Sequence, residues 1–415
     1  MYSKKEQSWK QIGADLDVEF MVEFIEKEHS NSMISLSEDG STIAIGSPGG
    51  AGSVRMYKND NSTWVQMGVD IVGEEFRDGL GTSVSLSTDG KTVAIGAPYT
   101  PSDDDGYYTS GQVRVFTYDD ATDAWEQKGE DINGEEMFFY SGQSVSLSAN
   151  GNTVAIGYIG GMQKYYDQGF VRVYDFDADT GGWGQRGEVL GGASGSSVSL
   201  SADGNTIAIA ALYLNRFNGY DYNYYNGAVR VHSYSGDTGS WEQKGEDIND
   251  ENEYDLSGYP VSLSADGSTI AIGSRFTPLD NKKNSALVRV YSYDDDTDGW
   301  EQRGRDIKEV ELENSVQQTV SLSADGSIVA VGYPSSNEVR AYVNKDGDTW
   351  KQLGDSIKGQ NEGQTVGNAV SLVENNGKVT LAVGSFNKYT SVYEITVVSV
   401  FMLMLFYVFQ TMHLF

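Results

Sequence analysis

Short stretches in which hydrophobic and polar residues alternate recur along almost the whole chain. Residues 83–87, with the sequence S-V-S-L-S, place apolar side chains two positions apart, which is the period of a β-strand with one buried face. A second kind of stretch, such as residues 92–96 (T-V-A-I-G), is nearly continuous in apolar residues and suits a strand buried on both faces. No sustained helical period interrupts these stretches, so the pattern predicts an all-β protein.

The stretches belong to repeats. All seven tryptophans lie in a W-x-Q-x-G motif, 50 to 61 residues apart, at Trp9, Trp64, Trp125, Trp183, Trp241, Trp300 and Trp350. A motif close to S-L-S-x-D-G-x-T-V-A-I-G begins at Ser35, Ser85, Ser146, Ser199, Ser262, Ser321 and Ser371. A third motif, V-R-V-Y, follows the second in six units and decays to T-S-V-Y at Thr390 in the last. Self-similarity at this period is typical of a repeat architecture.

Each unit predicts four strands, A to D. Strand A is S-V-S-L-S, and the Asp-Gly or Asn-Gly pair after it favours a two-residue type I′ hairpin turn into strand B. Strand C is V-R-V-Y, and strand D carries the tryptophan. The chain begins with a strand D at Trp9 and its last unit ends after a strand C near Tyr393, so the first strand can complete the last blade. We therefore predict a seven-bladed β-propeller of four-stranded blades over residues 1–394.

Three segments carry a family resemblance. They are the G-x-S-V-S-L-S segments at 81–87 and 142–148, the A-I-G-A-P segment at 94–98, and G-x-V-R-V-F at 111–116. In these the units resemble FG-GAP repeats, which build the seven-bladed propeller of integrin α subunits, and the resemblance covers residues 1–395. It implies a propeller used for recognition at the cell surface.

The chain departs from that family in its acidic loops. Many FG-GAP blades carry a D-x-D-x-D-G calcium loop between strands A and B, but here the loop is cut to S-A-D-G, and one carboxylate cannot cage calcium. The acids move to the C–D turns. The candidate that comes nearest to a calcium loop is Asp175, Asp177 and Asp179, with a solvated acidic turn as the alternative.

Residues that recur in every unit predict architectural roles. The strand D tryptophan is expected to anchor the packing between blades rather than to bind a substrate. The strand C arginine, such as Arg55 or Arg114, is expected to cover an aromatic face or to pair with a neighbouring acid. The last unit has Ser391 in that place.

Function is expected where the units differ, on loops held by the rigid frame. The A–B and C–D turns lie on one side of the predicted ring, and the B–C and D–A loops lie on the other. On this second side blades 2–4 have long loops rich in Tyr, Asn and Asp, which we call the variable face. Tyrosine offers a large contact area at low entropic cost. The candidate ligand-binding residues are Tyr107, Tyr108, Phe139, Tyr140, Tyr165, Tyr166, Tyr220, Tyr222, Tyr224 and Tyr225.

The amino-acid composition limits the classes of partner and of chemical site that the chain can have. Acidic residues outnumber basic ones 60 to 29, for a formal charge of −31, which argues against nucleic acid as a partner. There is no cysteine, so disulfides and thiolate metal sites are excluded. The three histidines, His29, His232 and His413, lie in no recognisable catalytic motif, and the chain is predicted not to be an enzyme. A glycoside hydrolase with paired carboxylates stays open, as does a quinoprotein-like enzyme, because residues 179–183 and 237–241 faintly resemble the tryptophan-docking motif of that eight-bladed family.

The two ends differ. Residues 395–415 contain no Asp, Glu, Lys or Arg, and their length suits a membrane-spanning helix. A membrane anchor is the favoured interpretation, beside an apolar extension packed on the propeller and an abnormal terminus. The N-terminal MYSKKEQSWK has no apolar run, so no signal peptide is visible.

The predicted function is non-enzymatic binding or adhesion, in which the variable face of a monomeric propeller recognises a protein or glycan at the cell surface or outside the cell. The main alternative is a soluble intracellular scaffold for protein interactions. No cofactor other than calcium is predicted.

Overall fold

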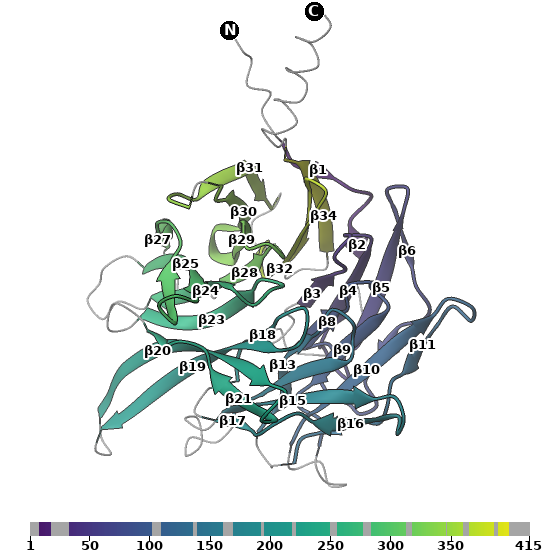
Figure 1. The fold of residues 1–415 in the computed structure, drawn as a ribbon. Coiled ribbons are helices and arrows are strands. Elements are labelled where there is room, and N and C mark those ends of the chain that lie inside the picture. The colour runs from purple at the N-terminus through teal and green to yellow at the C-terminus, as the bar shows by residue number, and fades with distance from the viewer. Residues whose placement is uncertain are drawn as a thin grey trace, which may run out of the picture.

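The computed structural model describes residues 8–17, 33–101, 109–135, 139–160, 169–191, 195–217, 221–249, 255–276, 284–312, 318–345, 347–359, 365–385 and 389–397. Within these residues the strands form seven antiparallel sheets arranged as the blades of a ring (Figure 1). The A strands of successive blades contact one another around the centre of the ring. The predicted seven-bladed β-propeller is therefore confirmed.

The first four blades follow the chain in order. Blade 1 contains β3 (Met33–Leu36), β4 (Thr42–Ser47), β5 (Ser53–Asp60), β6 (Thr63–Gln66) and β7 (Ile71–Val72). Blade 2 contains β8 (Ser83–Leu86), β9 (Thr92–Ala97), β10 (Gln112–Asp119), β11 (Ala124–Gln127) and β12 (Ile132–Asn133). Blade 3 contains β13 (Ser141–Leu147), β14 (Thr153–Tyr158), β15 (Phe170–Asp177), β16 (Gly182–Gln185) and β17 (Leu190–Gly191). Blade 4 contains β18 (Val198–Leu200), β19 (Thr206–Phe217), β20 (Asp221–Ser235), β21 (Ser240–Gln243) and β22 (Ile248–Asn249).

The last three blades complete the ring. Blade 5 contains β23 (Asp255–Leu263), β24 (Thr269–Phe276), β25 (Asn284–Asp294), β26 (Gly299–Gln302) and β27 (Ile307–Leu312). Blade 6 contains β28 (Thr319–Leu322), β29 (Ile328–Tyr333), a 3-10 turn (Pro334–Ser336), β30 (Glu338–Val343) and β31 (Lys351–Lys358). Blade 7 contains β32 (Ala369–Asn375), β33 (Lys378–Gly384) and β34 (Tyr389–Thr396), and the N-terminal β1 (Lys10–Gln11) and β2 (Leu16–Asp17) complete it.

The closure predicted from the sequence is present in blade 7. Lys10 pairs with Glu394 and Leu16 pairs with Thr390, so the N-terminal strand D lies against the last strand C. In six blades strand D is divided into two short segments that both pair with strand C. The division occurs at the glycine of W-x-Q-x-G, where Gly68, for example, has a φ of 63°. Each blade is thus four-stranded, with a bulged outer strand.

The A–B connection differs from the predicted two-residue turn. In blade 1 the Gly40 N–H donates to the Ser37 carbonyl at 2.8 Å, and among the turn residues only Gly40 has a positive φ, 68°. A type I′ turn would require positive φ at both central residues. The Asp39 carboxylate instead accepts hydrogen bonds from the Ser37 hydroxyl and the Ser41 N–H, at 2.7 and 2.9 Å. These bonds stabilise a longer turn in which aspartate keeps a negative φ.

An inner ring of hydrogen bonds joins the blades. The leucine N–H of each strand A donates to the central serine hydroxyl of the preceding blade, over 2.9 to 3.0 Å. All seven blades take part, and Leu36 donating to Ser371 closes the circle. Strand A is the inner edge of each sheet, so this serine satisfies an N–H that has no strand partner. The recurrence of S-L-S thus has a structural cause.

An outer ring joins the blades through tryptophan. Each indole N–H donates to a strand D carbonyl of the preceding blade, over 2.8 to 3.2 Å. The tryptophan also packs on the preceding blade's motif glycine. A Cβ at Gly187 would lie 2.8 Å from Trp241 Cδ1, and its φ of 70° also requires glycine. The predicted packing role of the tryptophans is confirmed.

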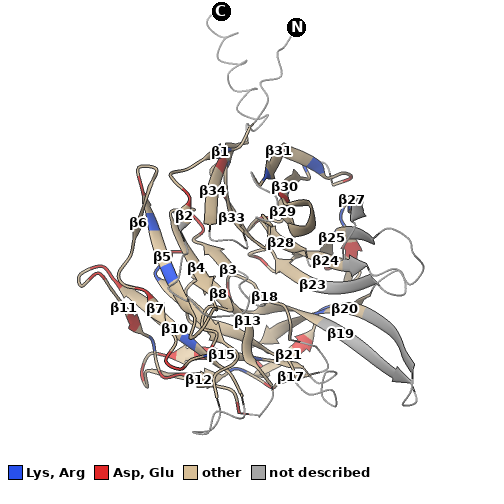
Figure 2. Ribbon diagram, turned by 180° about the vertical axis from the view of Figure 1, so that it is seen from behind, with Lys and Arg blue, Asp and Glu red and all other residues tan. Residues whose placement is uncertain are grey.

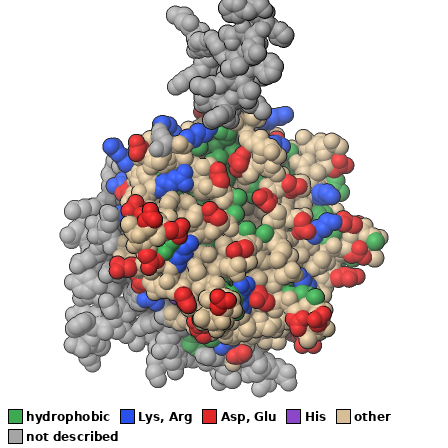
Figure 3. Space-filling view, in the orientation of Figure 1, with side chains coloured by type: hydrophobic (Ala, Val, Ile, Leu, Met, Phe, Trp, Pro, Cys, Tyr) green, Lys and Arg blue, Asp and Glu red, His purple; other side chains and the backbone are tan. Residues whose placement is uncertain are grey.

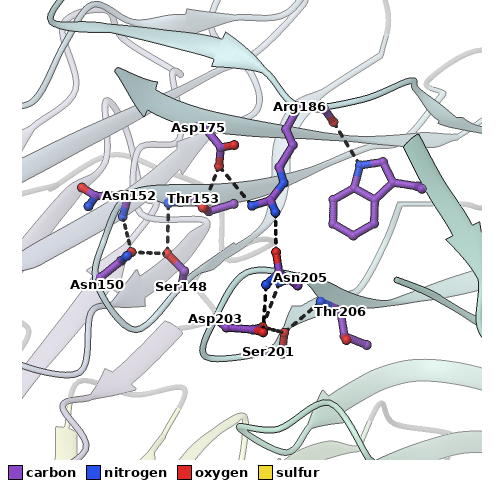
Figure 4. Close-up of polar contacts among 11 residues, drawn as sticks. Ser148, Asn150, Asn152, Thr153, Asp175, Arg186, Ser201, Asp203, Asn205 and Thr206 are labelled. Atoms are coloured by element: carbon purple, nitrogen blue, oxygen red, sulfur yellow. Dashed lines mark hydrogen bonds and ion pairs between the residues drawn. The ribbon is translucent and has the colours of Figure 1, made fainter. Parts of the chain in front are cut away.

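The core lies between the faces of adjacent blades. One cluster, for example, packs Val229 and Val231 of blade 4 against Val261 and Ile270 of blade 5. At the junction between blades 3 and 4, Arg186 of blade 3 donates hydrogen bonds to Asn205 in the A–B turn of blade 4 and to Asp175 in its own blade (Figure 4). Its guanidinium lies 4.0 Å from the centre of the Tyr234 ring. Polar and apolar contacts therefore join the same pair of blades.

Candidate binding face

The longest departure from the common frame is the B–C connection of blade 4. The sequence predicts a loop at residues 212–227, but β19 and β20 continue as a paired hairpin, from Leu212 opposite Gly227 out to Phe217 opposite Asp221. The register shifts once, between Leu214 and Arg216. The sequence signal that could have revealed this hairpin is Asn218-Gly219, a dipeptide favoured in hairpin turns.

The hairpin extends well beyond the ring. β19 has 12 residues and β20 has 15, whereas β14 and β15 in blade 3 have 6 and 8. At the rise of a β-strand, the six additional residues of β19 extend the hairpin by about 20 Å. Figure 1 shows it projecting past the neighbouring blades, with β23 of blade 5 beside it. The candidates Tyr222, Tyr224 and Tyr225 lie on β20 of this hairpin.

A second part of the variable face is an aromatic group between blades 2 and 3. Tyr140 lies in the D–A loop before β13, and its ring meets Tyr99 edge to face, with centroids 5.7 Å apart. The adjacent Phe139 is only 8% exposed and packs 5.4 Å from Phe170. Burial removes Phe139 from the accessible surface, so this predicted contact residue serves packing. Tyr140 is half-buried and stays available at the surface.

The structure describes the side chains of only two of the ten candidate ligand-binding residues, Phe139 and Tyr140. Five of the ten, Tyr107, Tyr108, Tyr165, Tyr166 and Tyr220, lie outside the described residues. For Tyr222, Tyr224 and Tyr225 the structure describes the backbone alone, so their part in binding stays a prediction.

The strand C arginines are held in two alternative ways. In four blades the arginine pairs with an aspartate of its own strand D, at 2.6 to 3.4 Å, in Arg55–Asp70, Arg114–Asp131, Arg230–Asp247 and Arg289–Asp306. The Arg55 guanidinium holds the pKa of Asp70 below its usual range. These aspartates were not among the predicted residues, although five of the seven units carry one six residues after the tryptophan.

In blades 3 and 6 the arginine pairs with a glutamate, Arg172 with Glu135 at 2.9 Å and Arg340 with Glu338, and it also lies over an aromatic ring. There the aspartate position is Val189 or Ser356. In the same two blades strand B ends in a buried tyrosine, and Arg172 lies 5.5 Å from the Tyr158 ring centre while Arg340 lies 5.3 Å from that of Tyr333. The other blades have serine or alanine at the tyrosine position. Both predicted partners of the arginine, an aromatic face and an acid, are therefore confirmed.

The calcium candidates have separate roles in this structure. Asp175 accepts hydrogen bonds from Thr153 at 2.7 Å and Arg186 at 3.3 Å. Asp177 accepts from the Asp179 N–H, which lowers the Asp177 pKa, and from the Thr180 hydroxyl. Asp179 is exposed. Among the described residues no cluster of three or more acidic or histidine side chains could hold a metal ion, so calcium binding stays a prediction.

Of the three histidines, His232 lies within the described residues. Burial lowers the pKa of His232, which stands in strand C where the other blades have Tyr or Phe.

At the C-terminal end, β34 extends to Thr396 and Ile395 is buried, so the first residues of segment 395–415 belong to blade 7. Residues 398–415 lie outside the described residues, and within those described no helix is long and apolar enough to cross a membrane.

Acidic side chains are spread over the face of the molecule seen in Figure 3, with basic ones among them.

No protein-family model matches this chain, and no curated protein sequence is significantly similar to it. The FG-GAP resemblance therefore stays a prediction.

Solved structures do share the fold. The β-propeller domain of Myceliophteria thermophila Cps50 (Swd1) is 12% identical, with a TM-score of 0.56, over 92% of this chain and 99% of that one. Saccharomyces cerevisiae Sqt1 is 14% identical, with a TM-score of 0.51, over 93% of this chain and 99% of that one. The periplasmic gluconolactonase PpgL of Pseudomonas aeruginosa is 17% identical, with a TM-score of 0.51, over 79% of this chain and 85% of that one.

These likenesses show the fold alone, but they correct one prediction. The conclusion that the chain is not an enzyme was wrong, because a propeller of the same fold is a gluconolactonase. An architecture without a recognisable catalytic motif gives no ground for excluding catalysis. The chain is a seven-bladed β-propeller, a fold that by itself does not decide between binding and catalysis.

Proposed function

We propose that this propeller binds a protein or glycan through the variable face, and that the β19–β20 hairpin is its principal contact element. The observation that carries the proposal is the continuation of this hairpin about 20 Å beyond the length of the corresponding strands of blade 3. A paired hairpin is pre-ordered, so a ligand that binds it loses less entropy than one that must order a loop.

The composition of the hairpin suits recognition. Residues 212–227 contain five tyrosines and four asparagines, which combine rigid amphipathic rings with adaptable hydrogen-bonding groups. The net charge of −31 favours ligands without dense negative charge. Tyr140 and Tyr99 would extend the contact surface toward blades 2 and 3.

The test replaces the three tyrosines of β20. The variant Y222S/Y224S/Y225S is compared with the unaltered chain on a glycan array, and by crosslinking to cell-surface proteins followed by mass spectrometry. The matched control, D295S/D296S/E301S, changes three exposed residues of the C–D turn and strand D of blade 5. We expect the tyrosine variant alone to lose the ligand, with its melting temperature unchanged. Equal ligand capture by both variants would contradict the proposal.

Location and family are parts of the same proposal. Tethering through residues 395–415 would hold the variable face at a cell surface, as the FG-GAP resemblance implies. Fractionation of cells that express the full chain or a chain ending at residue 397 tests this directly. The full chain is expected in the membrane fraction and the shorter chain outside it.

A turnover assay accompanies these measurements, because one propeller of this fold is a gluconolactonase. Hydrolysis of glucono-lactone by the full chain, followed with a pH indicator, would assign catalysis to the ring independently of the tyrosine hairpin.

A further inference from the structure

The outer strand of blade 1 carries an apolar surface. Among the described residues, six large hydrophobic side chains are exposed, and four of them lie between positions 65 and 76. They are Val65, Val69, Val72 and Phe76, with 52, 76, 59 and 66% exposure, and we call them the blade-1 stripe. Their closeness in sequence along one outer strand and the loop after it distinguishes them from scattered surface residues.

The other six blades supply an internal control for three of these positions. In blade 2 the residues equivalent to Val65, Val69 and Val72 are Glu126, Glu130 and Asn133, and all three are exposed. Across the other blades the same positions carry Lys, Arg, Asp, Glu, Asn, Gly or Ala, and never a large apolar residue. The frame does not require valine there, because six blades close without it.

The stripe lies on an open sheet edge. β6 pairs with β5 on one side and is the last strand of its sheet, so the backbone groups of its other side face outward. Proteins commonly protect such edges with charged side chains, as the other blades do here. Blade 1 instead has β-branched valines, which favour strand pairing. An edge of this kind is suited to receive an additional strand.

Charge decides what kind of strand fits. The C–D turn of blade 2 lies against the stripe, because the Gly68 N–H donates to the Asp123 carboxylate at 3.1 Å. Asp119 ends β10, Asp120 follows it, Glu126 lies on β11 and Glu130 lies just after β11. Lys58 lies opposite Val65 and Lys91 pairs with Asp120, but acidic side chains still outnumber basic ones here. Figure 2 shows acidic residues along β11 and its turn. A second copy of this chain, with a net charge of −31, would bring like charges together.

We propose that the blade-1 stripe binds an extended segment of a partner protein, which adds to β6 as an outer strand. Its apolar side chains alternate with lysine or arginine. The apolar residues cover Val65 and Val69, and the net positive charge of the segment complements the acidic turn of blade 2. This surface is independent of the variable face.

The test uses the full chain and a defined probe, the peptide K-V-K-V-K-V-K-V, with E-V-E-V-E-V-E-V as its acidic counterpart. The variant V65S/V69S removes the apolar side chains without changing the charge. The control variant V189S/N249S makes the same uncharged replacement on the outer strands of blades 3 and 4, at exposed positions away from the stripe. Affinity is measured by calorimetry, and amide exchange of residues 63–66 locates the bound peptide.

We expect the basic peptide to bind the unaltered chain and V189S/N249S alike, to protect the amides of β6, and to bind V65S/V69S at least about tenfold more weakly. The melting temperatures of all three should agree within about 2 °C, because the changed side chains are exposed. Equal affinity for V65S/V69S, or equal binding of the acidic peptide, would overturn the proposal. So would a dimer of the unaltered chain that V65S/V69S dissociates in sedimentation, because the occupant would then be a second copy.

Discussion

The junctions between blades and the outer surfaces of the blades follow different rules. At all seven junctions the same two hydrogen bonds recur, one from a leucine N–H to a serine and one from an indole to a carbonyl. On the outer strands, equivalent positions range from Val65 to Glu126. A junction residue must fit two blades at once, whereas an outer residue meets only solvent or a partner. Variation is therefore tolerated outside, and differences there indicate function or local compensation.

The largest effect is expected from breaking the outer ring at Trp241, the one motif tryptophan in the core of its junction, at 5% exposure. Trp241→Ala removes its packing on Gly187 and its bond to the Arg186 carbonyl, which should lower the free energy of unfolding by about 3 to 5 kcal/mol. Urea unfolding measures the loss. Tyr389→Ala, at a 42% exposed position, is the control, and a similar loss there would contradict the special role of the ring.

A smaller loss is expected from the inner ring. Ser85→Ala removes the acceptor of the Leu147 N–H, which has no strand partner on that side, and should cost about 1 kcal/mol. The same substitution at Ser321 should cost a similar amount, because it removes the same bond to Leu372. Clearly unequal urea midpoints for the two variants would show that the ring is less uniform than its geometry.

A gain is expected on the outer surface of blade 3. Val189→Asp restores the aspartate that holds the arginine in four other blades. In blade 3 Arg172 pairs with Glu135 at 2.9 Å, but its Nε is buried without a hydrogen-bond partner, and Gln185 bonds to the Gly187 carbonyl alone. The new carboxylate should raise the free energy of unfolding by about 1 kcal/mol above pH 5. Val189→Asn is the control, since it has the shape without the charge, and an equal gain from it would contradict the ion pair.

The smallest effect concerns pH and His232. Burial lowers its pKa in the folded protein, so the unfolded chain binds a proton more readily. The penalty is absent above the unfolded pKa of about 6.5 and grows as pH falls below it. The neighbouring charges are Arg230, Asp247 and Glu188. His232→Tyr, which introduces the residue of most other blades, should reduce the loss in melting temperature between pH 7.5 and 5.5. An unchanged loss would exclude His232 as its source.

Much of the frame could be predicted because it repeats. Seven tryptophans and seven S-L motifs, six of them S-L-S, identify seven blades, and their phase identifies the closing strand at Trp9. The candidate site was less accessible to prediction. Phe139 looks like a surface aromatic in a loop, and only the packing on Phe170 shows that it is buried. The enzyme question was decided wrongly from missing motifs, which a fold able to host many activities does not need.

The sequence by itself determined the number of blades, their closure and the anchoring role of tryptophan, because each of these depends on the spacing of residues within one repeating unit. Only the tertiary structure decided which partners those residues meet. The serine of one blade bonds the leucine of the next some 50 residues away, and Arg172 rests on a ring where Arg55 has an aspartate. It also showed that β19 and β20 continue as a hairpin and that the blade-1 stripe lies on an open edge. Contacts across blades depend on three-dimensional adjacency, which a single unit does not encode.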